Sequence, residues 1–225
     1  IIIIIIIIII VFFALNKKIM GVICSSLAIT LSAWFCFVEN HLLKNSTPSG
    51  SLTIVGWTMS HPKAEVATES ASLIVQLDAD VTLLTHGWHV RGEPSIQEWL
   101  GESGRKVVNS QFTLLTKFTP IHVQTLIASE GIYISEFILD TTSVLGDVLV
   151  VWAIDLPSSL KLSKMDIAAR ATRLLQTIEP SKPDIVIGDF NMTRNSVAMQ
   201  TLFPTLHDIS ETVGSGYFAS FPTNW

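Results

Sequence analysis

Two polar residues, Asp189 and Asn191, follow the apolar run 185–187 in the segment Ile-Gly-Asp-Phe-Asn-Met-Thr-Arg at positions 187–194. Residues two positions apart at the end of a strand point to the same side of the sheet. An aspartate can hold a hard cation or orient a water molecule, and an asparagine can hydrogen-bond a phosphoryl oxygen. The pair therefore indicates metal-assisted phosphate chemistry. An ordinary Asx-turn is the alternative interpretation of the same residues.

This motif is one of several that occur in a familiar order. The chain resembles the endonuclease/exonuclease/phosphatase superfamily, the DNase I-like metal-dependent phosphodiesterases, and in particular its bacterial members tethered to a membrane by N-terminal helices. The resemblance implies a four-layer α/β sandwich, two mixed β-sheets flanked by helices. The segments that carry it are LTIVGWT (52–58), DVTLLTH (80–86), LLTKFTPI (114–121), VVWAIDLPS (150–158), DIVIGDFN (184–191), LHD (206–208) and SFP (220–222).

The chain departs from the superfamily's motifs at three positions. Thr58 stands where the family has a catalytic Asn, His86 where it has a metal-binding Glu, and Asp155 where it has a His that contacts the scissile phosphate. The chain also stops at Trp225, before the Asp-His pair expected from the family, so we expect the domain to lack its C-terminal end.

The resemblance nevertheless assigns roles to five residues. Asp189, Asn191 and Asp155 are the expected catalytic residues, and Asn191 and Thr58 are the expected phosphate-binding residues. His86 and Asp189 are the expected metal ligands. The family implies Mg²⁺ as the cation, and an imidazole in place of a carboxylate makes Mn²⁺ and Zn²⁺ alternatives.

Two functions remain open on these residues. The first is a phosphoesterase, hydrolysing phosphodiesters or phosphomonoesters in an altered active site. The second is a catalytically inactive relative of the same fold that serves as an extracytoplasmic binding module. The three departures and the absent pair motivate the second interpretation. An incomplete gene product is a further explanation of the same departures.

Composition narrows the substrate class. The chain has 225 residues and a formal net charge of −5. Proteins that bind bulk nucleic acid carry a basic stripe that neutralises phosphates, and no such stripe is visible in the sequence. A small phosphoester or a lipid head group is therefore the expected substrate.

The N-terminal region predicts a membrane anchor. Residues 19–38 form a charge-free run after Lys17 and Lys18, and twenty residues of helix span about 30 Å, the thickness of the hydrocarbon core. A cleaved signal peptide, with a shorter apolar region, is the rival interpretation. By the positive-inside rule the lysines are cytoplasmic and the following domain is extracytoplasmic. The predicted organisation is an apolar segment of doubtful status (1–18), a transmembrane helix (19–38), a linker (39–51) and the phosphoesterase-like domain (52–225).

Hydrophobic periodicity and turn residues predict the elements of that domain. The clearest helix is 163–178, because Ser163 and Asp166 form a capping box ahead of an apolar face. By themselves these patterns indicate only an α/β or α+β fold. The other expected helices are 61–76, 93–100 and 195–202, and the expected strands are 52–57, 80–85, 112–115, 121–128, 132–139, 149–154 and 184–188.

Overall fold

The computed structural model describes residues 17–34, 52–59, 64–159, 161–194 and 196–209. The chain divides into two units, residues 1–48 with 207–225 and residues 49–206. All five residues predicted to do chemistry belong to the second unit.

The first unit contains helix α2 (Lys17–Ala33). Its apolar side chains are largely exposed, Val22 and Ile29 among them. The predicted span 19–38 is thus helical where it is described, and residues 1–16 and 35–51 lie outside the described part of the chain. Within that part no helix combines the length and the apolar character needed to cross a bilayer, so the transmembrane helix stays a prediction.

The second unit contains two mixed four-stranded sheets. Sheet A has the order β1-β2-β4-β3, in which β1 and β2 are parallel and the other neighbours are antiparallel. Helix α3 connects the two parallel strands, as a parallel crossover requires. The elements are β1 (Ile54–Thr58), α3 (Ala64–Leu77), β2 (Val81–Thr85), η2 (Val90–Gly92), α4 (Pro94–Leu100), β3 (Arg105–Asn109) and β4 (Phe112–Thr116).

Sheet B has the order β5-β6-β7-β8, with two antiparallel pairs followed by the parallel pair of β7 and β8. Here helix α6 makes the crossover. It begins as predicted, because the Ser163 hydroxyl caps it by accepting from the Asp166 backbone N–H. The elements are β5 (Thr119–Ser129), β6 (Ile132–Asp140), α5 (Thr142–Leu145), β7 (Leu149–Asp155), α6 (Lys164–Gln176), β8 (Ile185–Asp189) and α7 (Val197–Leu202).

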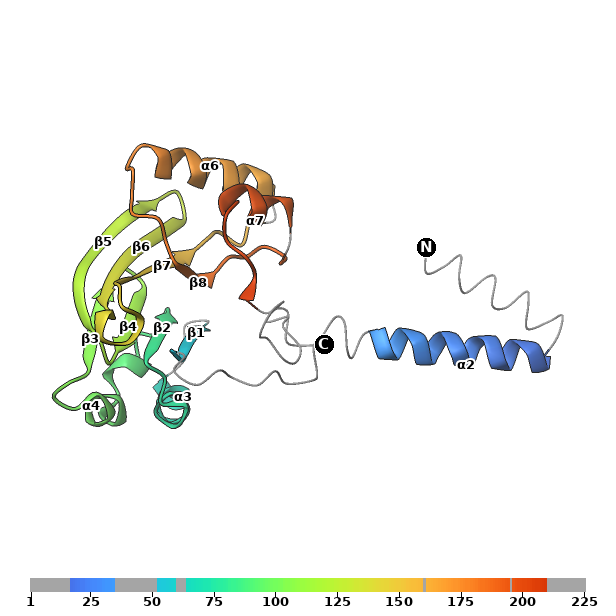
Figure 1. Ribbon diagram of the computed structural model, residues 1–225, viewed down its shortest axis with the longest axis horizontal. Helices are drawn as coiled ribbons and strands as arrows, with labels where there is room; N and C mark the ends of the chain where they lie inside the picture. Colours follow the sequence, from blue (N-terminus) through green and yellow to red (C-terminus); the bar gives the residue numbers. More distant parts are fainter. Residues whose placement is uncertain (1–16, 35–51, 60–63, 160, 195, 210–225) are drawn as a thin grey trace. The chain divides into compact units, whose positions relative to one another are not determined.

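Apolar side chains hold these elements together in four layers. Figure 1 shows α3 and α4 on one side of the two sheets and α6 and α7 on the opposite side. One core lies between the sheets, a second lies beneath α3 and α4, and a third lies beneath α6 and α7. Burying three such layers in a single unit stabilises the fold through the apolar area removed from water. The α/β sandwich of two mixed sheets flanked by helices is therefore confirmed.

Two glycines allow the sheets and strands to approach closely. A Cβ at Gly56 of β1 would lie 2.3 Å from Cγ2 of Ile187, on β8 of the facing sheet. Gly188 has φ 143°, and a Cβ there would lie 1.9 Å from the backbone oxygen of Ile154 on the neighbouring strand. The glycine of the Gly-Asp-x-Asn motif is thus required by the backbone of β8 itself.

Each helix and strand predicted for the domain is present among the described residues, with small shifts at the ends that are described; positions 61–63 and 195 of two predicted helices lie outside them. Strand β3, helix α5 and the short helix η2 were not predicted. Strand β3 is the edge of sheet A and includes Arg105, Lys106 and Asn109, so it lacks the apolar alternation of a half-buried strand.

Candidate functional site

Four strands end at the same place, on the inner faces of the two sheets. Side chains alternate along a strand, so the residues that share a face with the inter-sheet core can be read from the register. Val81 and Leu83 of β2 lie in that core, as do Val151 and Ala153 of β7. The alternation then places Thr58, Thr85, Asp155 and Asp189 on the inner faces, with Thr58 opposite Thr85 and Asp155 opposite Asp189.

His86 bridges the two sheets at this end. It follows β2 with φ 59°, and its backbone N–H donates to the Gln111 oxygen at 2.9 Å. Its Nε2 lies 3.0 Å from Oδ2 of Asp155, and the two side chains are 19% and 13% exposed. The Trp88 ring stands edge-on to the imidazole at 5.4 Å between centroids. Two predicted site residues 69 positions apart in the numbering are therefore direct partners.

Gln111 is a site residue that the sequence analysis did not identify. It is buried in the turn between β3 and β4. Its Nε2 donates to the same Oδ2 of Asp155 at 2.7 Å, and its Oε1 accepts from the Ser110 hydroxyl at 2.7 Å. Because its backbone oxygen also binds the His86 N–H, Gln111 contacts both members of the pair. Nothing local in the sequence marks it, since the contacts depend on how the two sheets stack.

The surroundings of Asp155 shift its acidity. Burial in the site raises the pKa of this carboxyl above its ordinary value. The hydrogen bond from Gln111 and the proximity of His86 act in the opposite direction, while the negative charge of Asp189 raises the pKa further. A carboxyl with a raised pKa, next to a second carboxylate and an imidazole, is typical of functional sites.

Asp189 and Asn191 form the turn that follows β8. Oδ1 of Asp189 accepts from the Asn191 backbone N–H at 3.1 Å, which is the Asx-turn that the sequence analysis considered. Nδ2 of Asn191 donates to the Leu156 backbone oxygen at 2.7 Å, and Asn191 has φ 49°. The turn fixes the direction of both side chains, and it uses one oxygen of the carboxylate and one amide hydrogen of the asparagine.

The threonines at the ends of β1 and β2 differ from each other. Thr58 is exposed, and among the described residues no hydrogen bond joins it to Asp155 or Asp189. Thr85 is 1% exposed, and its Oγ1 is buried with no hydrogen-bond partner in the described part of the chain. The structure thus brings Asp155, Asp189, Asn191 and His86 together, and it places Thr58 on the inner face of the other sheet, in register with Thr85.

Two carboxylate oxygens of the site remain available to a hard cation. Oδ1 of Asp155 and Oδ2 of Asp189 make no hydrogen bond to another described residue, and Mg²⁺ is commonly held by one or two carboxylates together with waters and substrate phosphate. Structural and catalytic zinc sites use three or four protein ligands. Among residues 17–34, 52–59, 64–159, 161–194 and 196–209, no three His, Cys, Asp or Glu side chains are grouped so as to hold a metal ion.

Comparison with known proteins gives matches in structure but none in sequence. No protein-family profile matches the chain, and no curated protein does. Among solved structures, a humanized TDP2 of D. rerio is similar with 13% identity and a TM-score of 0.49, over 68% of this chain and 67% of that one. An endonuclease/exonuclease/phosphatase family protein from Bacteroides thetaiotaomicron gives 11% identity and 0.44, over 68% of each chain. TDP2 of Caenorhabditis elegans gives 13% and 0.47, over 79% of this chain and 58% of that one. With TM-scores below 0.5, these neighbours do not decide the family or the activity of this chain.

Proposed function

We propose that this protein is a phosphoesterase that hydrolyses a small phosphodiester or phosphomonoester at the site formed by His86, Asp155, Asp189 and Asn191. One observation carries the proposal. The contact of 3.0 Å between His86 and Asp155 joins the ends of β2 and β7, and Asp189 lies in register with Asp155. Two carboxylates and an imidazole from different parts of the chain are thus gathered at the rim of the inter-sheet core.

The site atoms that make no hydrogen bond to the fold suggest what each residue does in the reaction. Asp189 keeps Oδ2 available to orient the attacking water, because only Oδ1 is used in the turn. Asn191 keeps one amide hydrogen for a phosphoryl oxygen, since the other binds Leu156. His86 is held by Asp155, so its imidazole is fixed in direction and can carry a proton during the reaction. Thr58, exposed at the end of β1, is a further donor for the phosphate.

A divalent cation belongs to this proposal for an electrostatic reason. The groups gathered here are two carboxylates and one imidazole, and such a site repels an anionic substrate unless a cation compensates. Asp155 and Asp189 would hold the cation, Mg²⁺ in the first instance, with Mn²⁺ as an alternative. When bound it would neutralise charge on the phosphoryl group.

The second candidate is a binding module of the same fold without hydrolysis. Saturated hydrogen bonding favours it, because Oδ2 of Asp155 already accepts from both Gln111 and His86, at 2.7 Å and 3.0 Å. The Asn191 amide is likewise engaged by backbone at 2.7 Å. Groups committed to the fold in this way are less available to a substrate.

Hydrolysis assays on the full chain separate the two candidates. We expect turnover of bis-p-nitrophenyl phosphate or p-nitrophenyl phosphate with Mg²⁺ or Mn²⁺, and its loss in Asp189→Ala. Asp184→Asn is the matched control, since Asp184 precedes the same strand and its Oδ2 caps the Val150 backbone N–H at 2.8 Å. Absence of turnover with Mg²⁺, Mn²⁺ and Zn²⁺ in a folded preparation would contradict hydrolysis and support the binding module instead.

The location and substrate class complete the proposal. The charge-free run 19–38 after two lysines supports a membrane anchor with the domain on the extracytoplasmic side. The net charge of −5 supports a small phosphoester or a lipid head group over bulk nucleic acid. Fractionation of expressing cells, followed by protease treatment of intact spheroplasts, tests the anchor: a domain that stays protected would contradict this orientation.

A further inference from the structure

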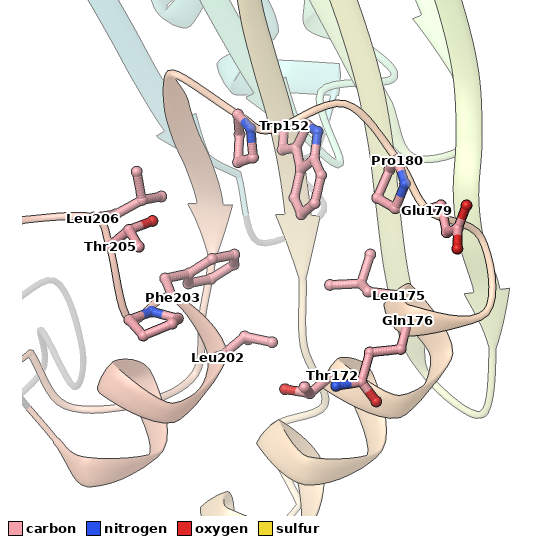
Figure 2. A pocket seen from close by; sticks show the side chains of 12 residues that line it. Trp152, Thr172, Leu175, Gln176, Glu179, Pro180, Leu202, Phe203, Thr205 and Leu206 are labelled. Atoms are coloured by element: carbon pink, nitrogen blue, oxygen red, sulfur yellow. The ribbon is translucent and has the colours of Figure 1, made fainter.

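A cavity lies on the outer side of sheet B, and none of the residues that line it belongs to the site at the strand ends. Its volume is about 430 Å³, within the range of small-molecule sites. The Trp152 side chain of β7 projects into it toward Leu175 and Leu202, with Phe203 on one side and Pro180 on the other (Figure 2). The cavity is therefore lined mainly by aromatic and aliphatic groups supplied by β7, α6 and the end of α7.

The indole of Trp152 is hydrogen-bonded to the buried carboxylate of Glu136. Its Nε1 donates to Oε2 of Glu136 at 3.2 Å, and this bond is buried. Glu136 is 1% exposed and its other oxygen accepts from Gln124 at 2.8 Å. A hydrogen bond from the indole N–H to a carboxylate moves electron density onto the ring, which strengthens the attraction of the ring for a cation.

The end of helix α6 adds negative potential at the rim of the cavity. The C-terminus of a helix carries partial negative charge and favours cations. Glu179, which also lines the cavity, follows this helix with φ 51°, a position where glycine is preferred and where an acidic side chain opposes the helix dipole. Figure 2 shows its carboxylate at the rim beyond Pro180. Glu179 is the only charged residue that lines the described cavity. Both its backbone conformation and its negative charge are unfavourable at the end of a helix.

A polar group without a partner lies in the same wall. Oγ1 of Thr172, on α6, is buried and has no hydrogen-bond partner within the described residues. A buried hydroxyl of this kind is stabilised when a ligand supplies a hydrogen-bonding group. Three prolines in the lining, at positions 180, 183 and 204, limit the backbone freedom of the walls.

From these observations we propose that the cavity over Trp152 binds a small organic cation, a quaternary or tertiary ammonium group with a hydroxyl nearby. The aromatic floor and the acidic rim complement the positive charge, and the aliphatic walls complement the alkyl groups around the nitrogen. This binding is independent of phosphoester hydrolysis, because none of the residues involved belongs to the site at the strand ends.

The test compares choline with its uncharged isostere 3,3-dimethyl-1-butanol. The full chain is labelled with 5-fluorotryptophan, the Trp152 signal is assigned with Trp152→Phe, and both compounds are titrated by ¹⁹F NMR. We expect choline to shift the Trp152 signal with a Kd roughly tenfold lower than that of the isostere. Equal affinities, no saturable shift with choline, or a shift confined to other tryptophans would each overturn the proposal.

Replacing single exposed carboxylates tests whether the charge of Glu179 contributes to choline binding. Glu179→Gln, at an exposed position, should weaken choline binding roughly threefold and leave the isostere unchanged. Glu69→Gln, an exposed carboxylate on α3, is the matched control and should change neither. If both variants weaken choline equally, the effect is net charge alone and the assignment to this cavity fails. Phosphatidylcholine vesicles as competitor distinguish a lipid-borne ammonium group, which displaces choline, from a soluble one.

Discussion

The two halves of the sandwich share one arrangement, a parallel pair at one edge followed by two antiparallel strands, and differ in their chemistry. In sheet A the parallel pair β1 and β2 is joined by α3, and in sheet B the parallel pair β7 and β8 is joined by α6. In each sheet this pair continues into antiparallel strands on one side. The parallel strands of sheet A end in Thr58 and Thr85, whereas those of sheet B end in Asp155 and Asp189.

The difference shows that the arrangement of the strands decides where side chains meet, and that the residue types at the strand ends decide which chemical groups are present there. Equivalent strand ends meet at one rim, yet the carboxylates come from one half only. Sheet A contributes its ionisable group, His86, one residue beyond the strand, where a left-handed backbone conformation accompanies its contact with Asp155. The ionisable groups of the site are thus distributed unevenly over two sheets that share one arrangement of strands.

The largest expected effect tests this asymmetry directly. Asp189→Ala should lower kcat by about 10³-fold, because it removes the carboxylate assigned to the attacking water. The equivalent change in the other half, Thr58→Ala, should lower kcat/KM by less than about tenfold, as expected for one exposed hydrogen bond. Steady-state kinetics with Mg²⁺ measure both. Comparable losses in the two variants would mean that both halves contribute equally to the reaction.

Each half has a glycine at a close approach, and substituting it measures how much that close approach contributes to stability. Gly188→Ala should destabilise the protein by about 3 kcal/mol or more, since the new Cβ would lie 1.9 Å from the Ile154 oxygen at φ 143°. Gly56→Ala meets a side-chain atom, Cγ2 of Ile187, at 2.3 Å rather than backbone and should cost about 1–3 kcal/mol. Urea denaturation gives both values. Gly56→Ala should cost less in an Ile187→Ala background, where Cγ2 is absent and the Cβ of residue 187 lies 3.8 Å away, whereas the Gly188→Ala loss should be unchanged there.

Gln111 tests the hydrogen bond that joins the two sheets at Asp155. Gln111→Leu removes the 2.7 Å hydrogen bond to Asp155 and should lower the free energy of unfolding by about 1–3 kcal/mol. Gln97→Leu is the control, because Gln97 is exposed and its hydrogen bond to the Arg91 oxygen is 3.5 Å long. That change should stay within about 0.5 kcal/mol. Equal effects would show that Gln111 contributes no more than a surface residue.

The smallest effect concerns an exposed carboxyl in the first half. The hydrogen bond from the Trp99 indole, followed by the hydrogen bond and charge of Lys117, lowers the pKa of Asp78 below its ordinary value of 3.8. A lowered pKa means that the stabilisation is present above 3.8 and is lost as the pH falls through the folded-state value. Urea midpoints of wild type and Asp78→Asn should therefore differ at pH 6 and converge as the pH falls below 3.8. A difference that stays constant with pH would show that ionisation of Asp78 is not involved.

Local patterns in the sequence determined most of the elements. Ser163 and Asp166 were sufficient to place the start of α6, because a cap involves only neighbouring residues. The Gly-Asp-x-Asn segment likewise specified a strand end and a turn, and the turn has the Asx hydrogen bond of the alternative interpretation. Strand β3 escaped prediction because an edge strand with charged residues carries little periodic signal.

Only the tertiary structure decided which of these residues meet. The partnership of His86 with Asp155, and the place of Gln111 beside both, depend on stacking one sheet on the other, which requires Gly56 to admit Ile187. The cavity over Trp152 is equally non-local, since β7, α6 and the residues after α7 each supply a wall. The physical reason is range: caps, turns and alternation act within a few residues, whereas packing and hydrogen bonds across a core join residues that the sequence keeps far apart.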